Sequence, residues 1–178
     1  MTPEQLDQLR FPIGKFSIKA DAGEAEMKKY ISEIEKLPAL LRKALEGLDD
    51  KHLDTPYRDG GWTVRQTVHH LADSHINAYV RVKLALTENN PAIKTYDENA
   101  WAKLPDSSMP VEASLSLLDG LHRRWVFLLK QLSAQDMKKT VFHPERKADI
   151  SISFFVQLYA WHCAHHTAHI TELRKRMK

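Results

Sequence analysis

Apolar residues recur at three- and four-residue steps along four stretches of the chain, which is the spacing of one buried face of an α-helix. This pattern predicts helices over about residues 22–48, 63–87, 111–133 and 151–177, and it leaves almost nothing that reads as strand. Pro38 is expected to kink the first of these helices. Residues 1–20 lack the pattern and are interpreted as an N-terminal arm.

Capping and turn residues support the second helix in particular. Gly60 and Gly61 are typical of a turn, Thr63 suits the N-cap, and Gln66 three residues later completes a capping box. The preceding letters, "DTPYRDGG", indicate a turn with polar side chains. In the long link at residues 88–110, the letters "DENAWAKL" indicate a short helix.

The length of 178 residues suits a single domain with its own hydrophobic core, and we expect one domain over residues 1–178. Four helices of this length in one small domain predict an all-α fold, a four-helix bundle with short extra helices in its loops.

Composition narrows the function classes only slightly. A formal charge of +3 is too small to indicate a nucleic-acid partner, and the basic letters "RKRMK" end the last helix, where cations suit the helix dipole. Neither a signal-like apolar run near the start nor a membrane-length apolar run is present, so we expect a cytoplasmic protein without membrane contact. The lone Cys163 cannot form an internal disulfide.

Four histidines fall within eight positions of the last predicted helix, in the letters "YAWHCAHHTAHITEL". At about 100° per residue they share one side of the helix, and His162 and His166 fall within its apolar stripe. Their i, i+4 spacing is the one that helical zinc sites use. Two buried imidazoles without partners would cost a few kcal/mol, so we favour a shared metal ion over two separately hydrogen-bonded core histidines.

A third ligand must come from another helix, and the second predicted helix offers His69, His70 and His75. Periodicity aligns His75 with the apolar residues of that helix, whereas His70 falls among polar ones. That polar row is either a solvent face or the lining of a pocket, and the pattern alone favours solvent slightly. His122 and His143 are interpreted as surface or loop residues.

Three segments resemble a known family, the YfiT-type metal-dependent hydrolases of the DinB/YfiT-like superfamily. The segments are "DTPYRDGGWTVRQTVHHLADSH", "PAIKTYDENAWAKL" and "YAWHCAHHTAHITEL", and the likeness extends from residue 11 to residue 173. The signature of the superfamily matches Trp62 and Thr63, then His70 with Leu71, and finally the His-x-x-x-His pair at residues 162 and 166.

The resemblance implies one divalent metal ion per chain, held by His70, His162 and His166, in a bundle of unusual helix order. It also implies a homodimer. Many superfamily members carry glutamine at the position of His169, so the role of this residue is left open between fourth ligand, hydrogen-bond partner and base. Asp73, one turn from His70, is interpreted either as a partner of that ring or as a solvated carboxylate.

Three neutral imidazoles leave a divalent ion its full charge and an open position, which suits zinc and is compatible with nickel or iron. The resemblance and this chemistry predict an enzyme, a metal-dependent hydrolase that activates water and acts on a small-molecule substrate. One alternative is a thiol S-transferase that activates a low-molecular-weight thiol. Another is a binding module that the metal stabilises without catalysis.

Overall fold

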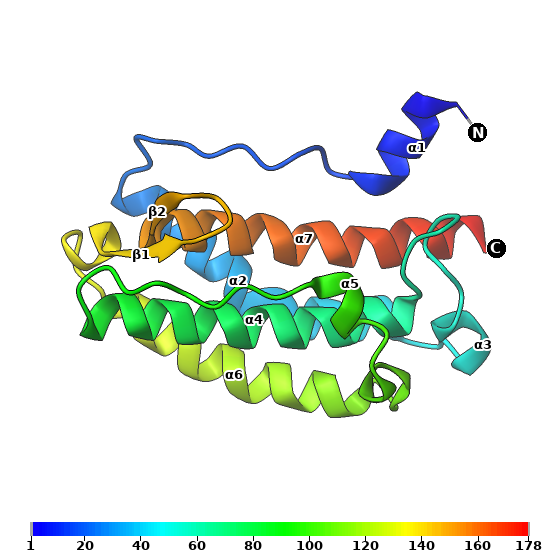
Figure 1. Ribbon diagram of the computed structural model, residues 1–178. Coiled ribbons are helices and arrows are strands. Elements are labelled where there is room, and N and C mark those ends of the chain that lie inside the picture. The colour runs from blue at the N-terminus through cyan, green and yellow to red at the C-terminus, as the bar shows by residue number, and fades with distance from the viewer. Residues whose placement is uncertain (1, 178) are drawn as a thin grey trace.

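The computed structural model describes residues 2–177, and within that range it contains four long helices. They are α2 (Glu24–Leu45), α4 (Val64–Thr87), α6 (Glu112–Lys130) and α7 (Ile152–Arg176). Each lies inside the range that the apolar pattern predicted. The helices pack together along their lengths (Figure 1), which confirms the all-α four-helix bundle.

The order of the helices around the bundle differs from their order along the chain. Both α2 and α4 pack against α6 and against α7, so α2 lies diagonally across the bundle from α4. Consecutive long helices are therefore not always neighbours. This order places α4 directly beside α7, although the whole of α6 separates them in sequence.

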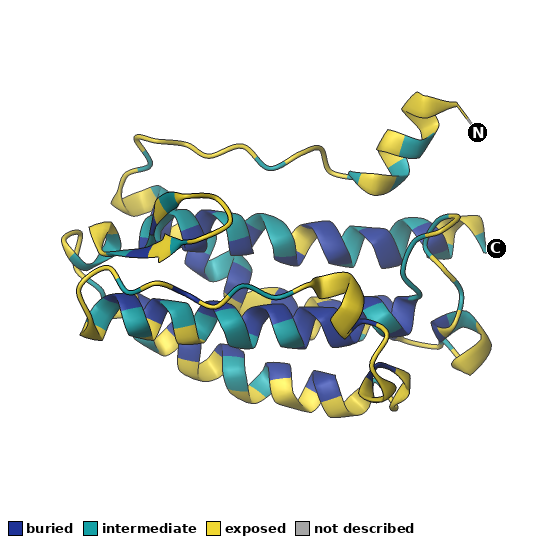
Figure 2. Cartoon of the chain, in the orientation of Figure 1, coloured by how far each residue is buried: buried dark blue, intermediate teal, exposed yellow. Residues whose placement is uncertain are grey.

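In α2 and α6 one face is buried and the opposite face is exposed, whereas α7 and the first half of α4 are buried or half-buried nearly all round (Figure 2). In α2 the buried face follows the predicted repeat through Ile34, Leu37 and Leu41, and the helix continues through Pro38. None of the helices described between residues 2 and 177 combines the length and the apolar content needed to cross a membrane.

The start of α4 confirms the predicted capping box. The Thr63 hydroxyl accepts a hydrogen bond from the backbone N–H of Gln66 at 3.0 Å, and the Gln66 side chain accepts one from the Thr63 N–H at 3.0 Å. Gln66 also donates to the carbonyl of Ala102 at 2.8 Å. This bond ties α4 to the end of the short helix α5 (Glu98–Trp101), which lies within the letters "DENAWAKL" as expected. The 3₁₀ turn η1 (Pro105–Ser108) follows and packs against α4 separately.

The N-terminal arm is more structured than the sequence pattern predicted. It opens with a helix, α1 (Pro3–Arg10), and then runs extended along α7 (Figure 1). The Trp161 indole donates to the carbonyl of Gly14 at 3.2 Å, and the Gln157 amide exchanges two hydrogen bonds with the backbone of Lys19. These contacts hold the arm against the helix that carries the histidine cluster.

A small hairpin was also missed by the periodicity. Strand β1 (Thr140–His143) pairs antiparallel with β2 (Ala148–Ser151), with Val141 opposite Ile150, after the 3₁₀ turn η2 (Asp136–Lys138). Strands of four residues are too short to show a convincing alternation. The hairpin leads directly into α7, whose first turn is capped by the Ser151 hydroxyl.

Two neighbouring leucines of α2 allow a matched test of the core. Leu41 is 0% exposed, whereas Leu40 is 49% exposed. We expect Leu41→Ala to lower the free energy of unfolding by about 2–5 kcal/mol, because it leaves a cavity in the bundle. Leu40→Ala should change it by no more than about 0.5 kcal/mol. Urea unfolding followed by circular dichroism measures both, and equal losses would contradict the burial pattern.

Candidate metal centre

The structure brings His70 of α4 together with His162 and His166 of α7. One ring nitrogen from each residue can be chosen so that all three atoms lie within 4.8 Å of one another. The Nε2 atoms of His70 and His162 are 3.3 Å apart. The side-by-side packing of α4 and α7 thus gathers the residues that sequence and resemblance selected.

The spacing of these nitrogens suits a tetrahedral metal ion. Two nitrogen ligands, each about 2.0–2.1 Å from a tetrahedral ion, lie about 3.3–3.4 Å from one another, and the two Nε2 atoms have this separation. The cluster consists of imidazoles alone, a donor set that suits zinc and is compatible with nickel or iron. The residues present therefore fit a divalent metal of this kind.

Burial keeps the rings of the cluster neutral. His70 and His166 are 9% and 7% exposed, and His162 is half-buried. Desolvation lowers the pKa of His70 to about 4 and the pKa values of His162 and His166 well below their usual range, with neighbouring imidazoles adding a smaller effect at the latter two. A neutral imidazole is the form that coordinates a metal.

His169, three residues after His166 on α7, contacts the His166 ring. The Nε2 atom of His169 lies 3.1 Å from the carbonyl oxygen of Arg10, which can only accept, so Nε2 carries the proton. The unprotonated Nδ1 of His169 then faces Nδ1 of His166 at 3.4 Å. Ring nitrogens of His165, His166 and His169 also lie within 4.8 Å of one another, close enough to share an ion, so both the ligand role and the hydrogen-bond role of His169 stay predictions.

The turn before α4 covers the cluster with aromatic rings. Gly60 adopts a positive φ of +63°, and a Cβ atom on Gly61 would lie only 2.8 Å from the Arg58 side chain, so both positions favour glycine. This tight turn places the Trp62 ring against the His70 ring, with centroids 4.4 Å apart, and stacks the Tyr57 ring on the His169 ring, with centroids 4.0 Å apart. The residues before Trp62 form the turn that the sequence indicated, and within it the half-buried Tyr57 packs its ring against His169.

Of the two roles left open for Asp73, the contact with His70 is not present. Among the described residues, the Asp73 carboxylate makes no hydrogen bond to that ring, and it is half-buried near Asp106 instead. Burial and the Asp106 charge raise the pKa of Asp73. The structure thus gives no support for Asp73 as the residue that orients His70.

His122 corrects the sequence interpretation, which placed it on the surface. It is 2% exposed, and its Nε2 lies 2.8 Å from Nδ1 of His75, which is 0% exposed as periodicity indicated. The spacing of His122 from Leu118 and Trp125 places it in the buried stripe of α6, so the signal was present in the sequence. His143 lies on β1 and is partly exposed, in agreement with its interpretation.

Comparison with known proteins identifies the family. A model of the DinB superfamily matches residues 33–170, which include all three clustered histidines. The chain belongs to the DinB superfamily. One solved structure superposes with a TM-score of 0.93 at 50% sequence identity, covering 96% of this chain and 98% of the other. That structure is described as "YfiT from Bacillus subtilis is a probable metal-dependent hydrolase with an unusual four-helix bundle topology".

Relatives in sequence carry the same description. A "putative metal-dependent hydrolase" of Bacillus cereus strain B4264 is 56% identical over 172 residues, spanning 97% of this chain and 99% of the relative. A protein of the same description from Bacillus thuringiensis subsp. konkukian strain 97-27 is 55% identical over the same spans. The family resemblance inferred from the sequence is thereby confirmed.

The buried neutral histidines predict an acid-sensitive metal-free protein. Burial lowers the pKa of His122 to about 4, against about 6.5 in an unfolded chain, so the unfolded state binds more protons between these values. The free energy of unfolding should be highest above about pH 6.5. At lower pH it should decrease by about 1.4 kcal/mol per pH unit for each such ring.

Urea unfolding in a chelator, at several pH values from about 7.5 to 5.5, checks this expectation in a range above the titration of ordinary carboxylates. Because His70 and His169 also have pKa values lowered to about 4, the slope should exceed that of one ring. His122→Gln should reduce it by about one proton. A flat profile would contradict the burial of these groups as neutral rings.

Proposed function

We propose that this member of the DinB superfamily is a metal-dependent hydrolase, with one zinc ion held by His70, His162 and His166. The observation that supports the proposal most directly is the imidazole-only cluster, with Nε2 atoms of two different helices 3.3 Å apart. The descriptions of the relatives and of the B. subtilis structure support the reaction class.

The donor set determines what chemistry the site offers. An ion bound by three neutral rings keeps its positive charge and an open position, and when bound it acts as a Lewis acid that activates water near neutral pH. The residues of the chain hold and orient the site. Nδ1 of His169 lies 3.4 Å from Nδ1 of His166, and the Trp62 ring packs against the His70 ring.

Access to the cluster favours a small substrate. The rings of His70 and His166 are buried, the turn that carries Tyr57 and Trp62 covers one side, and the N-terminal arm runs along α7 on another. We therefore propose a small-molecule substrate, because a folded macromolecule could not bring a scissile bond to buried nitrogens. The homodimer that the resemblance implies stays a prediction.

Adjacent histidines of α4 provide a matched test of metal binding. We expect the purified protein to bind about one equivalent of zinc, and His70→Ala to weaken binding strongly because it removes one of three ligands. His69→Ala is the control, since the His69 ring bonds Ser114 and the Met109 carbonyl instead of the cluster. Elemental analysis and competition with a chromogenic chelator measure the result. Equal zinc binding by wild type and His70→Ala would exclude the proposed ligand set.

A panel of chromogenic esters and amides tests the reaction class. Zinc-loaded protein should release the leaving group without added thiol, and both the metal-free protein and His70→Ala should lose that activity down to the background rate, because water is no longer activated. A parallel assay supplies a low-molecular-weight thiol with an electrophile and follows thiol consumption. Metal-dependent turnover only in the thiol assay would replace the hydrolase by a transferase. Zinc that raises the melting temperature without turnover in either assay would favour a binding module.

A further inference from the structure

A chain of hydrogen-bonded rings leads from the candidate ligand His162 across the core of the bundle to α2. Nδ1 of His162 lies 3.1 Å from Nε2 of His75, and Nδ1 of His75 lies 2.8 Å from Nε2 of His122. Nδ1 of His122 lies 2.8 Å from the backbone carbonyl oxygen of Ile34. The three rings come from α7, α4 and α6, and the carbonyl comes from α2.

Pro38 explains why the Ile34 carbonyl is free to end this chain. In an α-helix the carbonyl of residue 34 would accept a hydrogen bond from the N–H of residue 38, and proline has none. Ile34 is fully buried, so its carbonyl would lack a partner without His122. The proline that the sequence analysis read as a kink thus leaves a buried acceptor pointing toward α6.

This acceptor sets the direction of every bond in the chain. A carbonyl oxygen can only accept, so Nδ1 of His122 carries a hydrogen, and its Nε2 in the neutral ring must accept. Nδ1 of His75 therefore donates to His122, and Nε2 of His75 accepts from Nδ1 of His162. If every bond ran the other way, Nδ1 of His122 would carry no hydrogen and would face the Ile34 carbonyl oxygen, which is also an acceptor. Burial keeps the rings neutral, since it lowers the pKa of His122 to about 4 and that of His75 well below its usual range.

We propose that His75 and His122 are positioning residues, which fix His162 in the tautomer whose Nε2 is unprotonated and faces His70. The proposal rests on the proposed function in one respect, namely that His162 holds the metal. A metal ligand must offer a lone pair, and the hydrogen bond at its other nitrogen decides which atom offers it. The backbone of α2 thereby sets the state of a ligand on α7.

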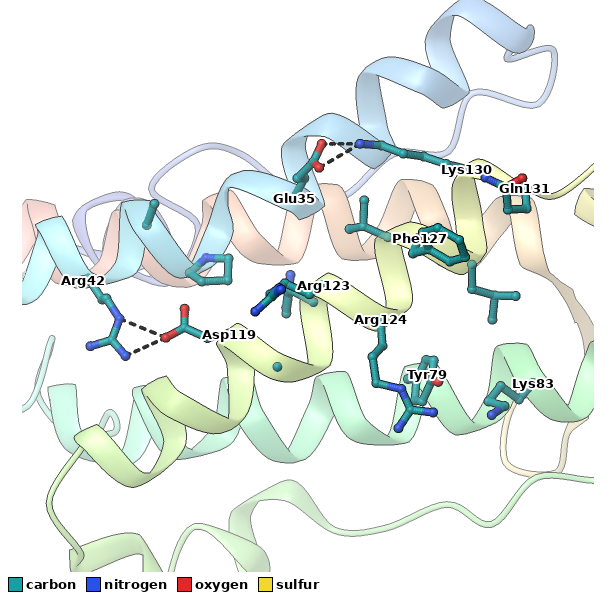
Figure 3. A pocket seen from close by; sticks show the side chains of 16 residues that line it. Glu35, Arg42, Tyr79, Lys83, Asp119, Arg123, Arg124, Phe127, Lys130 and Gln131 are labelled. Atoms are coloured by element: carbon teal, nitrogen blue, oxygen red, sulfur yellow. Dashed lines mark hydrogen bonds and ion pairs between the residues drawn. The ribbon is translucent and has the colours of Figure 1, made fainter.

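We use the term relay for the chain formed by His162, His75, His122 and the Ile34 carbonyl. Neighbouring side chains surround it on both sides. Two ion pairs join α2 to α6 on the same side of these helices, Arg42 with Asp119 at 2.7 Å and Lys130 with Glu35 at 2.7 Å (Figure 3). These pairs line a groove of about 1300 Å³ on the outer side of the two helices. Such exposed pairs stabilise weakly.

On the inner side, aromatic rings enclose His75. Trp125 and Tyr159 both pack edge-on against it, with centroids 5.8 and 5.0 Å away. Tyr159 is fixed in turn, because its hydroxyl donates to the Ser74 carbonyl at 3.1 Å. Among the described residues no competing donor or acceptor reaches the nitrogens of His75, whose hydrogen bonds go only to His122 and His162.

Nitrogen NMR of the histidine rings tests the tautomers directly. In ¹⁵N-labelled wild type kept metal-free by a chelator, we expect His122, His75 and His162 each to carry the hydrogen on Nδ1. Long-range proton–nitrogen correlation spectra separate the two tautomers, because protonated and unprotonated ring nitrogens differ widely in chemical shift. A hydrogen on Nε2 of His162 in the folded protein would overturn the proposal.

Two substitutions at one position test the consequence for metal binding. His122→Phe fills the volume but offers His75 no acceptor, so the direction of the bonds is lost, and we expect zinc affinity to fall about 10–100-fold. His122→Gln can donate its amide N–H to Ile34 and accept from His75 with its oxygen, so it should bind zinc within a few-fold of wild type. His69→Phe, which removes a buried histidine of α4 outside the relay, should also leave the affinity nearly unchanged.

Chelator competition gives the affinities, and circular dichroism shows which variants are folded. A folded His122→Phe protein with wild-type affinity would overturn the proposal, as would equal losses in the Gln and Phe variants. If His122→Phe does not fold, the tautomer spectrum of the wild type and the affinity of His122→Gln still decide. Should the wild type bind no zinc, the proposed function fails, whereas the spectra of the metal-free protein test the relay independently.

Discussion

An imidazole buried in a protein has two ring nitrogens, and each needs a partner, because a polar group removed from water without one costs free energy. The core between α4 and α7 contains several such rings. This constraint accounts for the positions of three parts of the fold around the rings, namely the neighbouring helices, the turn before α4 and the N-terminal arm. Each supplies an acceptor, a donor or an apolar cover for a particular ring.

Two of the buried histidines donate a hydrogen bond to a backbone carbonyl. His169 donates to the carbonyl of Arg10 at the end of α1, and His122 donates to the carbonyl of Ile34 in α2. Because carbonyls can only accept, they set the tautomers of the rings that follow. Along the relay this leaves Nε2 of His162, which faces His70, unprotonated, and that is the state that a cation requires.

The likeness to relatives described as metal-dependent hydrolases extends over nearly the whole chain, from the arm to the last helix. This extent is consistent with a site whose supporting residues are spread over α1, α2, α4, α6 and α7. A cluster built only from the three candidate ligands would need no arm along α7 and no proline in α2. The same burial that makes the rings acceptable ligands also restricts access to small molecules.

By itself the sequence determined the local features of this protein. The apolar repeats predicted the long helices, Thr63 and Gln66 predicted the cap of α4, and the i, i+4 spacing of His162 and His166 indicated a shared ion. These signals are local because helical periodicity and capping depend on residues within a turn or two of each other. The four-residue strands of the hairpin carried too little of such a signal, whereas the helix in the arm begins with a capping box at Thr2 and Gln5 that the apolar repeat does not reveal.

Only the tertiary structure decided which distant residues meet. Periodicity could not select His70 as a ligand, and only the family resemblance did so. In the structure, the packing of α4 on α7 places Nε2 of His70 3.3 Å from Nε2 of His162. His122 was misread although its spacing fits the buried stripe of α6, and nothing local links it to His75 or to the carbonyl that Pro38 leaves free. Hydrogen bonds between helices depend on the order of those helices around the bundle, which is a property of the whole fold.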